Sequence, residues 1–286
     1  FLMKFKILVF KRRCLALILL FLLLSLAAVI IYVHFAGFVM WKTLLLFAGC
    51  FIALNILFVL FWAVVAIFVS TAKPITKQSG ICRLGCISVS SVMCGYAWVH
   101  AHIHGMDKLP TGERFLFVCN HRSMFDPLIV MSKLQEYNIS FISKPSNMRI
   151  PIVGRVSYGA GFLPIDRENN RNALKTILTA ADYLEKDICS VGIYPEGTRS
   201  KTPSLLPFHP GSFKIAQKAG VPLVIASISG SEKIKRNLFL RPTNVDLSIL
   251  DVVPADKVKE MSTNELADYS RGLIERSLPK AVKEAV

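Results

Sequence analysis

Acidic side chains are absent from residues 1–72, although the chain of 286 residues contains 19 Asp and Glu in total. Two segments in this part, residues 14–33 and 43–72, carry no charge at all. At about 1.5 Å per helical residue, each is long enough to cross a hydrocarbon core of about 30 Å. The mean hydropathy of +0.48 is also too high for a purely soluble protein. We therefore expect an N-terminal transmembrane helical hairpin.

The first apolar segment lacks the clear small-x-small cleavage site of a secretory signal peptide and is too long for one, so an uncleaved anchor is expected. Basic residues gather before the first segment and after the second, whereas Lys42 stands alone between them. These flanking residues are Lys4, Lys6, Lys11, Arg12 and Arg13, and then Lys73, Lys77 and Arg83. Positive charge marks the cytoplasmic side. We expect a multi-pass protein of the cell membrane, with residues 1–78 as the anchor and residues 79–286 as a domain on the cytoplasmic side.

The ligand pairs of a zinc site are lacking as well. Seven cysteines are scattered through the apolar segments and the remaining chain, which favours free thiols. Cys82 and Cys86 have no second ligand pair, so we interpret them as structural. His100, His102 and His104 alternate, which suits either one face of a strand or, as we favour, polar residues in an interfacial segment. We expect no metal site.

Motifs of nucleic-acid binding are missing too, despite a net charge of +15. The chain shows no helix-turn-helix, zinc finger or aromatic RNA-binding strand. Residues 73–286 carry 28 Lys and Arg against 19 acidic residues, a balance that favours phosphate-bearing substrates, acidic lipid headgroups or nucleic acid. Because the chain has a membrane anchor, we expect membrane lipids as partners and no nucleic acid.

Short apolar runs alternate with amphipathic segments from Arg114 onward, a pattern typical of an α/β domain. The expected strands are Phe115–Cys119, Ile139–Ser143, Gly161–Ile165, Ser190–Tyr194, Pro222–Ser229 and Val245–Val253. The expected helices are Pro127–Gln135, Asn169–Lys186, Ser212–Ala219, one from Ser262 toward Lys283, and a surface helix within residues 81–100. We therefore predict a mostly parallel or mixed sheet flanked by helices. In such sheets ligands bind at the carboxyl ends of the strands.

The run Asn120-His-Arg-Ser-Met-Phe-Asp126 directly follows the first expected strand. Its His121 and Asp126 have the spacing of an oriented general base, in which the carboxylate holds one ring nitrogen while the other faces a substrate hydroxyl. A second interpretation makes Asp126 a helix N-cap before Pro127. Both interpretations remain open for the same residue.

Three further blocks follow expected strands and carry cations, at Lys144, at Arg167 and at residues 195–200. If the strands are neighbours, Lys144, Arg167 and Arg199 converge with Glu196 on the His–Asp pair, an arrangement suited to a phosphate-bearing alcohol. Gly197 would allow close approach of the backbone, and Thr198 and Ser200 would add hydroxyl donors. Alternatively, Arg167 pairs with Asp166 or Glu168 on the surface, and Pro195-Glu-Gly is a plain turn.

These blocks resemble the glycerolipid acyltransferase family. The motifs that carry the resemblance are Asn120-His121-x4-Asp126, Gly161-x3-Ile165-Asp166-Arg167, Tyr194-Pro-Glu-Gly-Thr-Arg199 and Gly220-Val-Pro-Leu-Val224. They occur in the family's order and spacing, over roughly residues 100 to 230. The resemblance implies transfer of a fatty acyl group from acyl-CoA or acyl carrier protein to the free hydroxyl of lysophosphatidic acid, giving phosphatidic acid. Glycerol 3-phosphate and other lysophospholipids are the alternative acceptors.

The resemblance also implies roles for single residues. His121 corresponds to the family's base and Asp126 to the residue that orients it. Arg167, Glu196 and Arg199 correspond to residues associated with the acceptor and its phosphate. We add Lys144, Gly197 and Thr198 as substrate-binding candidates and expect no cofactor beyond the acyl donor.

Two alternatives to base catalysis remain. Ser123 is a conceivable nucleophile beside His121, but it lacks a glycine-flanked elbow, so we favour a polar residue in a turn. A membrane-anchored protein that binds anionic lipids without chemistry would show the same basic surface. Such a protein would not need a His–Asp pair beside its cations.

Overall fold

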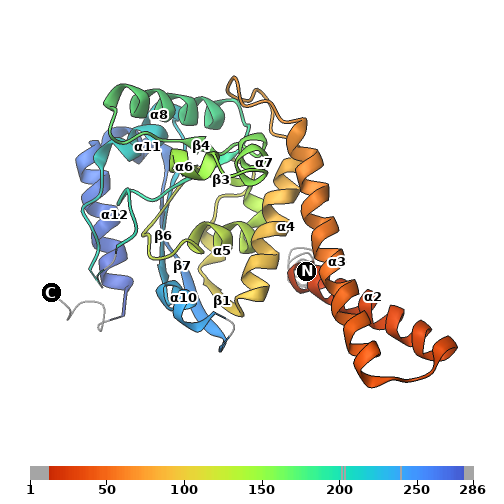
Figure 1. Cartoon of the computed structure of the whole chain (residues 1–286). Coiled ribbons are helices and arrows are strands. Elements are labelled where there is room, and N and C mark those ends of the chain that lie inside the picture. The colour runs from red at the N-terminus through yellow and green to blue at the C-terminus, as the bar shows by residue number, and fades with distance from the viewer. Residues whose placement is uncertain (1–12, 201, 203, 239, 280–286) are drawn as a thin grey trace. The chain divides into compact units, whose positions relative to one another are not determined.

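The computed structural model describes residues 13–200, 202, 204–238 and 240–279. Within these residues the chain divides into two compact units between Val69 and Ser70. The first unit contains helices α2 (Arg13–Ala36) and α3 (Met40–Ile67). The second contains a sheet with helices on both faces (Figure 1).

The helices of the first unit have the composition and length of membrane spans. Leu17–Ala36 and Met40–Ile67 are both apolar and long enough to cross a bilayer. Gly37, with φ of 77°, lies in the short connection between them, and Phe21 packs edge-on against Phe58 with ring centroids 6.2 Å apart. Many of their large apolar side chains are exposed, which favours association with a membrane. These features are those of the predicted hairpin.

The charges behind the predicted orientation are only partly visible. Lys4, Lys6, Lys11 and Arg12 lie outside the described residues. Lys42 is exposed at the start of α3. The orientation of the hairpin therefore stays a prediction.

The sheet of the second unit is mixed, as predicted. Its strand order is β1-β7-β6-β2-β5-β3-β4, and all neighbours are parallel except β6 and β7. The strands are β1 (Val99–His104), β2 (Leu116–Cys119), β3 (Ile139–Ser143), β4 (Leu163–Pro164), β5 (Ser190–Ile193), β6 (Leu223–Ser229) and β7 (Thr243–Val253). The central strands β2 and β5 are buried throughout, as expected for strands covered on both faces.

Helices cover both faces of this sheet (Figure 1). One layer contains α8 (Asn170–Glu185), α9 (Lys214–Ala219), α11 (Ala255–Glu260) and α12 (Thr263–Ser277), and the other contains α4 (Gly80–Tyr96), α5 (Asp126–Lys133) and α7 (Val153–Gly159). Short helices α6 (Pro145–Met148) and α10 (Ile234–Asn237) lie in connections. Sequence signals set two of the starts, because Asn169 caps α8 and Ser262 forms a capping box with Glu265 at α12.

Three predictions about elements need correction. The alternating histidines belong to strand β1 rather than to an interfacial segment, and all three lie on its exposed face. The strand alternative is the one that holds, since the histidine face of β1 points to solvent while Ala101 and Ile103 lie on its less exposed face. The expected strand at Gly161–Ile165 shrinks to two residues, since it pairs only with the end of β3. The last helix ends at Ser277, and residues 280–286 lie outside the described part.

Candidate active site

The four blocks of the sequence meet at one edge of the sheet. Strands β2, β5, β3 and β4 are consecutive neighbours and run parallel, so their carboxyl ends lie on the same side. His121 follows β2, Lys144 follows β3, Arg167 follows β4 and Glu196 follows β5. The strands that carry the blocks are therefore neighbours, which is the condition that the predicted convergence required.

Asn120 fixes the chain where β2 ends. Its side-chain amide donates to the carbonyl of Ile228 at 2.9 Å, and its oxygen accepts from the Ile228 amide at 2.8 Å. The side chain thereby continues the pairing of β2 with β6 for one more residue, and it is completely buried. This clamp sets the position from which the His121 side chain leaves the sheet.

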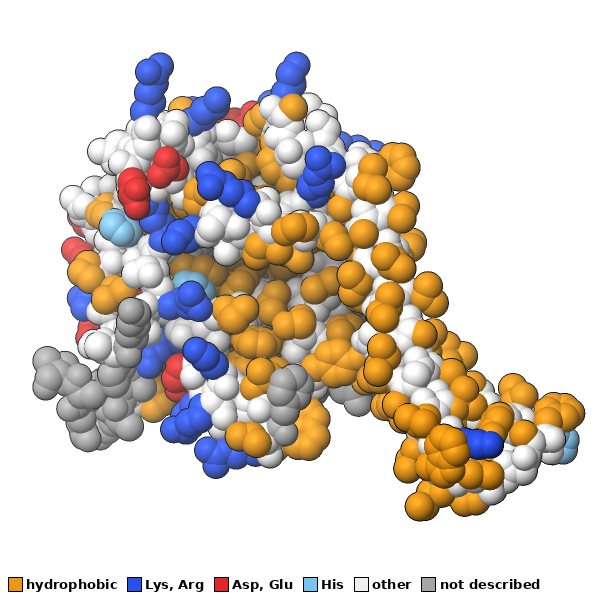
Figure 2. Space-filling model, in the orientation of Figure 1, with side chains coloured by type: hydrophobic (Ala, Val, Ile, Leu, Met, Phe, Trp, Pro, Cys, Tyr) orange, Lys and Arg blue, Asp and Glu red, His pale blue; other side chains and the backbone are white. Residues whose placement is uncertain are grey.

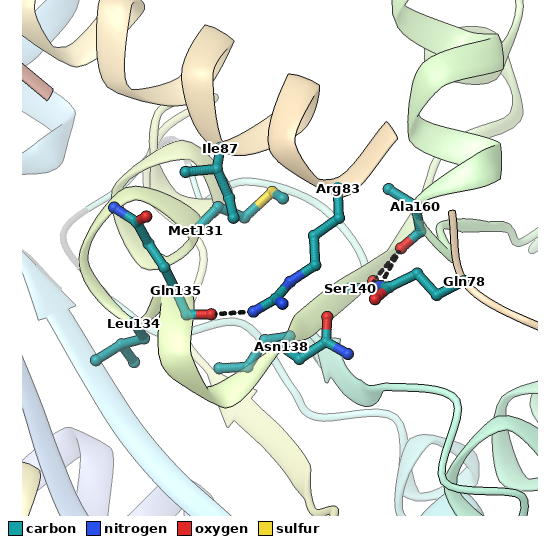
Figure 3. A pocket seen from close by; sticks show the side chains of 10 residues that line it. Gln78, Arg83, Ile87, Met131, Leu134, Gln135, Asn138, Ser140 and Ala160 are labelled. Atoms are coloured by element: carbon teal, nitrogen blue, oxygen red, sulfur yellow. Dashed lines mark hydrogen bonds between the residues drawn. The ribbon is translucent and has the colours of Figure 1, made fainter. Parts of the chain in front are cut away.

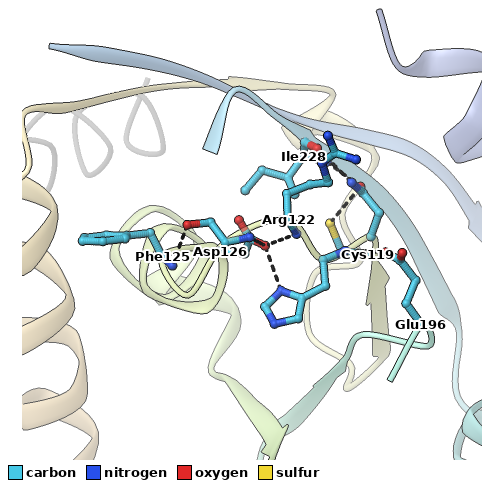
Figure 4. Close-up of polar contacts among 9 residues, drawn as sticks. Cys119, Arg122, Phe125, Asp126, Glu196 and Ile228 are labelled. Carbon is cyan, nitrogen blue, oxygen red and sulfur yellow. Dashed lines mark hydrogen bonds and ion pairs between the residues drawn. The ribbon is translucent and has the colours of Figure 1, made fainter. Parts of the chain in front are cut away.

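Asp126 organises the turn that carries His121 (Figure 4). Its Oδ2 lies 2.8 Å from Nδ1 of His121 and accepts the main-chain amides of Arg122 at 2.7 Å and Ser123 at 2.8 Å. The predicted His–Asp hydrogen bond is therefore present. The capping interpretation is wrong, because Asp126 is the first residue of α5 and its carboxylate binds amides that precede the helix; Phe125 occupies the N-cap position.

The hydrogen bonds assign the proton on the imidazole. An ionised carboxylate only accepts, and Asp126 already receives two amide protons at the same oxygen. Nδ1 of His121 is then the N–H that donates, which leaves the lone pair of a neutral ring on Nε2. The structure shows no hydrogen-bond partner for this Nε2 among the described residues. The His121 side chain is 18% exposed, so this nitrogen belongs to a group that solvent or substrate can reach.

Two aromatic rings support the imidazole from behind. His121 stacks on Tyr194 at 4.2 Å between centroids and 17° between planes, and Tyr194 stacks on Phe141 at 5.3 Å and 8°. Burial raises the pKa of Tyr194 well above its ordinary value, so its hydroxyl stays protonated. The sequence motifs gave neither ring a role at the base. His121 follows β2, Tyr194 follows β5 and Phe141 lies on β3, so their stacking can be inferred only once the strand order is known.

Glu196 binds the main chain of the same turn. Its Oε1 accepts the amide of His121 at 2.6 Å, and its Oε2 accepts the amide of Leu206 at 3.0 Å. The carboxyl group is buried, and this burial raises its pKa, while the two amide donors oppose the rise. Glu196 therefore ties the His121 turn to the loop after β5. Both carboxylate oxygens of Glu196 accept main-chain amides.

Gly197 and Arg167 lie against each other beside this carboxyl group. Gly197 has φ of 74°, and an added Cβ would come within 3.0 Å of the His209 ring and 3.6 Å of Cζ of Arg167. A side chain here would be strained and would press on the His209 ring, whereas Arg167 would lie at an ordinary contact distance. Partial burial lowers the pKa of Arg167, and the structure shows no ion pair between it and Asp166 or Glu168. The alternative of a surface ion pair for Arg167 is therefore wrong.

The remaining candidates differ in exposure. Lys144, Thr198 and Arg199 are exposed, and among the described residues no hydrogen bond or ion pair joins them to the side chains of the His–Asp pair. Ser200 is buried, and its hydroxyl donates within the loop toward the carbonyls of Thr202 and Ser204, each at 2.8 Å. Its own amide donates to the carbonyl of His121 at 3.0 Å. Ser200 is thus part of the scaffold, and the prediction that it offers a hydroxyl to a ligand is wrong.

Ser123 occupies a turn, as favoured from the sequence. Its Oγ accepts the amide of Phe125 at 3.3 Å, and its own amide is bound by Asp126. The side chain is buried with 9% exposure. No hydrogen bond joins the Ser123 hydroxyl to His121, which is the contact that an activated nucleophile needs.

A small pocket lies elsewhere, at the amino end of β3 (Figure 3). Its polar side chains are bound to the backbone, since Arg83 donates to the carbonyl of Gln135, Gln78 to Ala160 at 2.8 Å and Asn138 to Ile188 at 3.3 Å. Because β3 runs parallel to β5 and β2, this pocket is at the edge of the sheet opposite His121. Its polar groups stabilise the fold.

Comparison with known proteins defines the class. The profile of the family described as Acyltransferase matches residues 100–229, the part of the chain from β1 to β6. The fold is similar to that of the crystal structure of the 1-acyl-sn-glycerophosphate (LPA) acyltransferase PlsC from Thermotoga maritima, with a TM-score of 0.57 and 23% identity. The match covers 71% of this chain and 78% of that one.

Curated relatives are more similar in sequence. The 1-acyl-sn-glycerol-3-phosphate acyltransferase of Salmonella typhimurium is 32% identical over 173 residues, which cover 59% of this chain and 69% of that protein. The enzyme of the same name from Escherichia coli K12 is 31% identical with the same coverage. The chain belongs to this acyltransferase family and is an enzyme of the 1-acyl-sn-glycerol-3-phosphate O-acyltransferase type.

Proposed function

We propose that this enzyme transfers a fatty acyl group from an acyl thioester to the free hydroxyl of lysophosphatidic acid, giving phosphatidic acid. The observation that carries the proposal is the His121 imidazole, which is bound to Asp126 through Nδ1 and whose Nε2 has no hydrogen-bond partner in the part of the chain that the structure describes. This nitrogen belongs to the edge of the sheet from which Lys144, Arg167 and Arg199 also extend. A base beside cations fits an acceptor that carries both a hydroxyl and a phosphate.

In the proposed reaction, Nε2 of His121 removes the proton of the acceptor hydroxyl as its oxygen attacks the thioester carbonyl. The tetrahedral intermediate then collapses, the carbon–sulfur bond breaks, and the thiolate takes the proton from His121. Asp126 stabilises the imidazolium that exists between these steps. No acyl-enzyme forms, which agrees with a Ser123 hydroxyl that is bound in a turn.

Arg167 and the exposed Lys144 and Arg199 are proposed to bind the acceptor phosphate. Arg167 is the member of this set whose guanidinium packs against the glycine turn, at Gly197. Thr198 and Arg199 follow in that turn and are exposed, so both can reach a ligand over it. Paired guanidinium groups give a phosphate more hydrogen bonds than lysines do.

For Glu196 we propose a positioning role. Its two oxygens accept the amides of His121 and Leu206, so it fixes the position of the His121 turn relative to the loop after β5 and does not contact the acceptor. This differs from the contact with the acceptor that the family resemblance implies. Three residues then position the catalytic pair. Asn120 binds the main chain of β6, Tyr194 stacks on the imidazole, and Glu196 accepts the amide of His121.

The setting of the reaction is part of the proposal. Residues 1–78 would anchor a multi-pass protein in the cell membrane, and residues 79–286 would form the acyltransferase domain on its cytoplasmic side. Acyl-CoA and acyl carrier protein are both compatible donors, because each is anionic. We propose that no metal or other cofactor takes part. Among the described residues no three His, Cys, Asp or Glu side chains form a metal-binding group.

The test is an assay of the purified protein with labelled acyl-CoA and, separately, acyl carrier protein charged with the same acyl chain. The acceptors are lysophosphatidic acid, glycerol 3-phosphate and lysophosphatidylcholine. We expect labelled phosphatidic acid as the main product. Preference for another acceptor would replace the proposed substrate, and lipid binding without any product would support the non-catalytic alternative.

A further inference from the structure

A second surface of the catalytic unit combines exposed apolar tips with basic side chains. Trp98, between α4 and β1, is 55% exposed, and Leu240, between α10 and β7, is 78% exposed. Four exposed cations lie close to Leu240 in the sequence, within residues 232–241, where Glu232 is the acidic residue. The cations are Lys233, Lys235, Arg236 and Arg241. We call Trp98, Leu240 and these four cations the basic lobe.

The lobe is tied together by buried polar contacts. The carbonyl of Trp98 accepts the amide of Thr243 at 2.9 Å, and Asn237 donates from its side chain to Oγ1 of Thr243 at 3.0 Å. The main-chain carbonyl of Asn237 accepts the amide of Leu240 at 2.9 Å, and its side-chain oxygen accepts Nε of Arg241 at 2.9 Å. Asn237 and Thr243 are both buried. Trp98 and Leu240 are therefore held on one scaffold although they are far apart in the sequence.

The backbone of Trp98 is in a conformation that bulky residues rarely adopt, with φ of 48°. The adjacent Ala97 is buried, whereas the indole is exposed. Figure 2 shows basic side chains gathered over α10 with hydrophobic ones beside them. An indole and a leucine that project beside cations are the side chains that enter the interface of an anionic bilayer.

The strand directions place the lobe at the same edge as His121. Strand β1 is parallel to β7, β7 is antiparallel to β6, and β6 is parallel to β2. The start of β1 and the end of β6 therefore lie at the edge where β2 ends. With strands about 4.8 Å apart, β1 is roughly 14 Å from β2 along this edge. A surface that binds the lobe would also be close to the catalytic base.

We propose that the basic lobe docks on the surface of an anionic lipid bilayer, as an attachment of the catalytic unit additional to the apolar helices α2 and α3. The four cations bind the lipid phosphates, and Trp98 and Leu240 enter the interface between headgroups and acyl chains. An acidic carrier protein would match the cations, but it would leave the exposed indole and leucine without a reason. The bilayer is the occupant that matches both kinds of side chain.

The test uses the full chain reconstituted into phosphatidylcholine vesicles, with and without phosphatidylglycerol. Trp41→Phe and Trp62→Phe leave Trp98 as the sole tryptophan, since the chain has three. We expect brominated phospholipid to quench its emission, and more strongly when phosphatidylglycerol is present. Reversal of two cations, Lys235→Glu with Arg236→Glu, should roughly halve the quenching. Because both leaflets have the same composition, the orientation of the protein in the vesicle does not affect the result.

The matched control is Lys257→Glu with Lys259→Glu. These exposed lysines follow β7, at the opposite edge of the sheet, so their reversal should leave quenching unchanged. Leu240→Cys with an environment-sensitive label gives a second readout that keeps all tryptophans. The proposal would be overturned if brominated lipid quenched neither the emission of Trp98 nor that of the label. A change in the emission of Trp98 or of the label that appears only after acyl carrier protein is added would assign the lobe to the donor instead.

Discussion

Glu196 holds the amide of His121 at 2.6 Å from its buried Oε1. The base is thus fixed from two sides, because Asp126 holds its ring nitrogen while Glu196 holds its main chain. The two carboxylates do different work. Asp126 sets the tautomer of the imidazole, whereas Glu196 sets where the turn lies relative to β5 and the loop that follows it.

Glu196→Gln tests this second support. The amide side chain has a single acceptor oxygen, so the N–H of His121 or of Leu206 must face an NH2 group. Leaving a buried donor unpaired costs about 1 to 3 kcal/mol. We expect lower turnover with little change in the KM for the acceptor, measured by initial rates across acceptor concentrations. A large rise in KM with unchanged kcat would instead place Glu196 in contact with the acceptor.

The wild type and Glu196→Gln should also differ in how their stability depends on pH. Burial raises the pKa of Glu196 above its ordinary value of 4.5, so the folded protein binds this proton more tightly than the unfolded chain. Stability from this group is therefore greatest below 4.5 and falls as the pH rises through the raised pKa of the folded state. The stability of the wild type relative to Glu196→Gln should decline over that window and then level off. Unfolding of both proteins at a series of pH values measures it, and a relative gain with rising pH would contradict the assignment.

Tyr194 offers a matched pair of substitutions. Its hydroxyl is buried and has no hydrogen-bond partner among the described residues, so Tyr194→Phe keeps the stacked ring and removes an unsatisfied group. We expect that protein to retain its activity. Tyr194→Leu loses the stacking, worth about 0.5 to 1.5 kcal/mol, and frees the imidazole to rotate. Its turnover should be several-fold lower. Equal rates for the two variants would show that the stack does not position His121.

Arg199→Ala should mainly weaken use of the acceptor. Loss of a charge-assisted hydrogen bond costs about 1.5 to 3 kcal/mol, which corresponds to about ten- to a hundred-fold in kcat/KM. Arg199→Lys should restore only part of the loss, because lysine has no planar pair of donors. Acceptor kinetics of the three proteins measure the effect. Unchanged kinetics with weaker vesicle binding would move Arg199 from the site to the lipid surface.

The predicted topology can be tested with single cysteines. Lys42→Cys lies at the start of α3, next to its connection with α2, and Lys257→Cys lies in the catalytic unit; both positions are exposed. An impermeant thiol reagent added to intact cells should label position 42 and not position 257. The unaltered chain provides the background. Labelling at position 257 would place the acyltransferase domain outside the cytoplasm.

Much of this arrangement was predictable from the sequence, for reasons that the structure makes clear. The His121–Asp126 bond forms within one turn, and the parallel strands bring Lys144, Arg167 and Glu196 to one edge. The first feature depends on local spacing, and the second on strand direction and on the condition that these strands are neighbours, which the structure meets.

The supports of the base were not predictable in this way. The clamp of Asn120 on Ile228 and the stack on Tyr194 join residues that are distant in the sequence. Strand β1 was the less favoured of two alternatives, because the exposed histidine face of an edge strand is as polar as an interfacial segment. The helix-cap interpretation of Asp126 failed because the direction of its hydrogen bonds depends on how the turn folds.

Asp126→Asn tests whether the carboxylate of Asp126 acts on the His121 imidazole or only holds the turn together. Asparagine can still accept the amides of Arg122 and Ser123, so the fold should survive. It is neutral and cannot stabilise the imidazolium, so turnover should fall by about a hundred-fold or more. Near-normal turnover in a folded Asp126→Asn protein would reduce Asp126 to a structural residue.

The central claim is that His121 is the base that deprotonates the acceptor. The most direct measurement is the rate of labelled phosphatidic acid formation from lysophosphatidic acid and acyl-CoA by purified His121→Ala, beside the wild type. The account predicts that the variant folds, inserts into membranes and loses turnover by about a hundred-fold or more. Formation of phosphatidic acid at a near-normal rate by His121→Ala would contradict it.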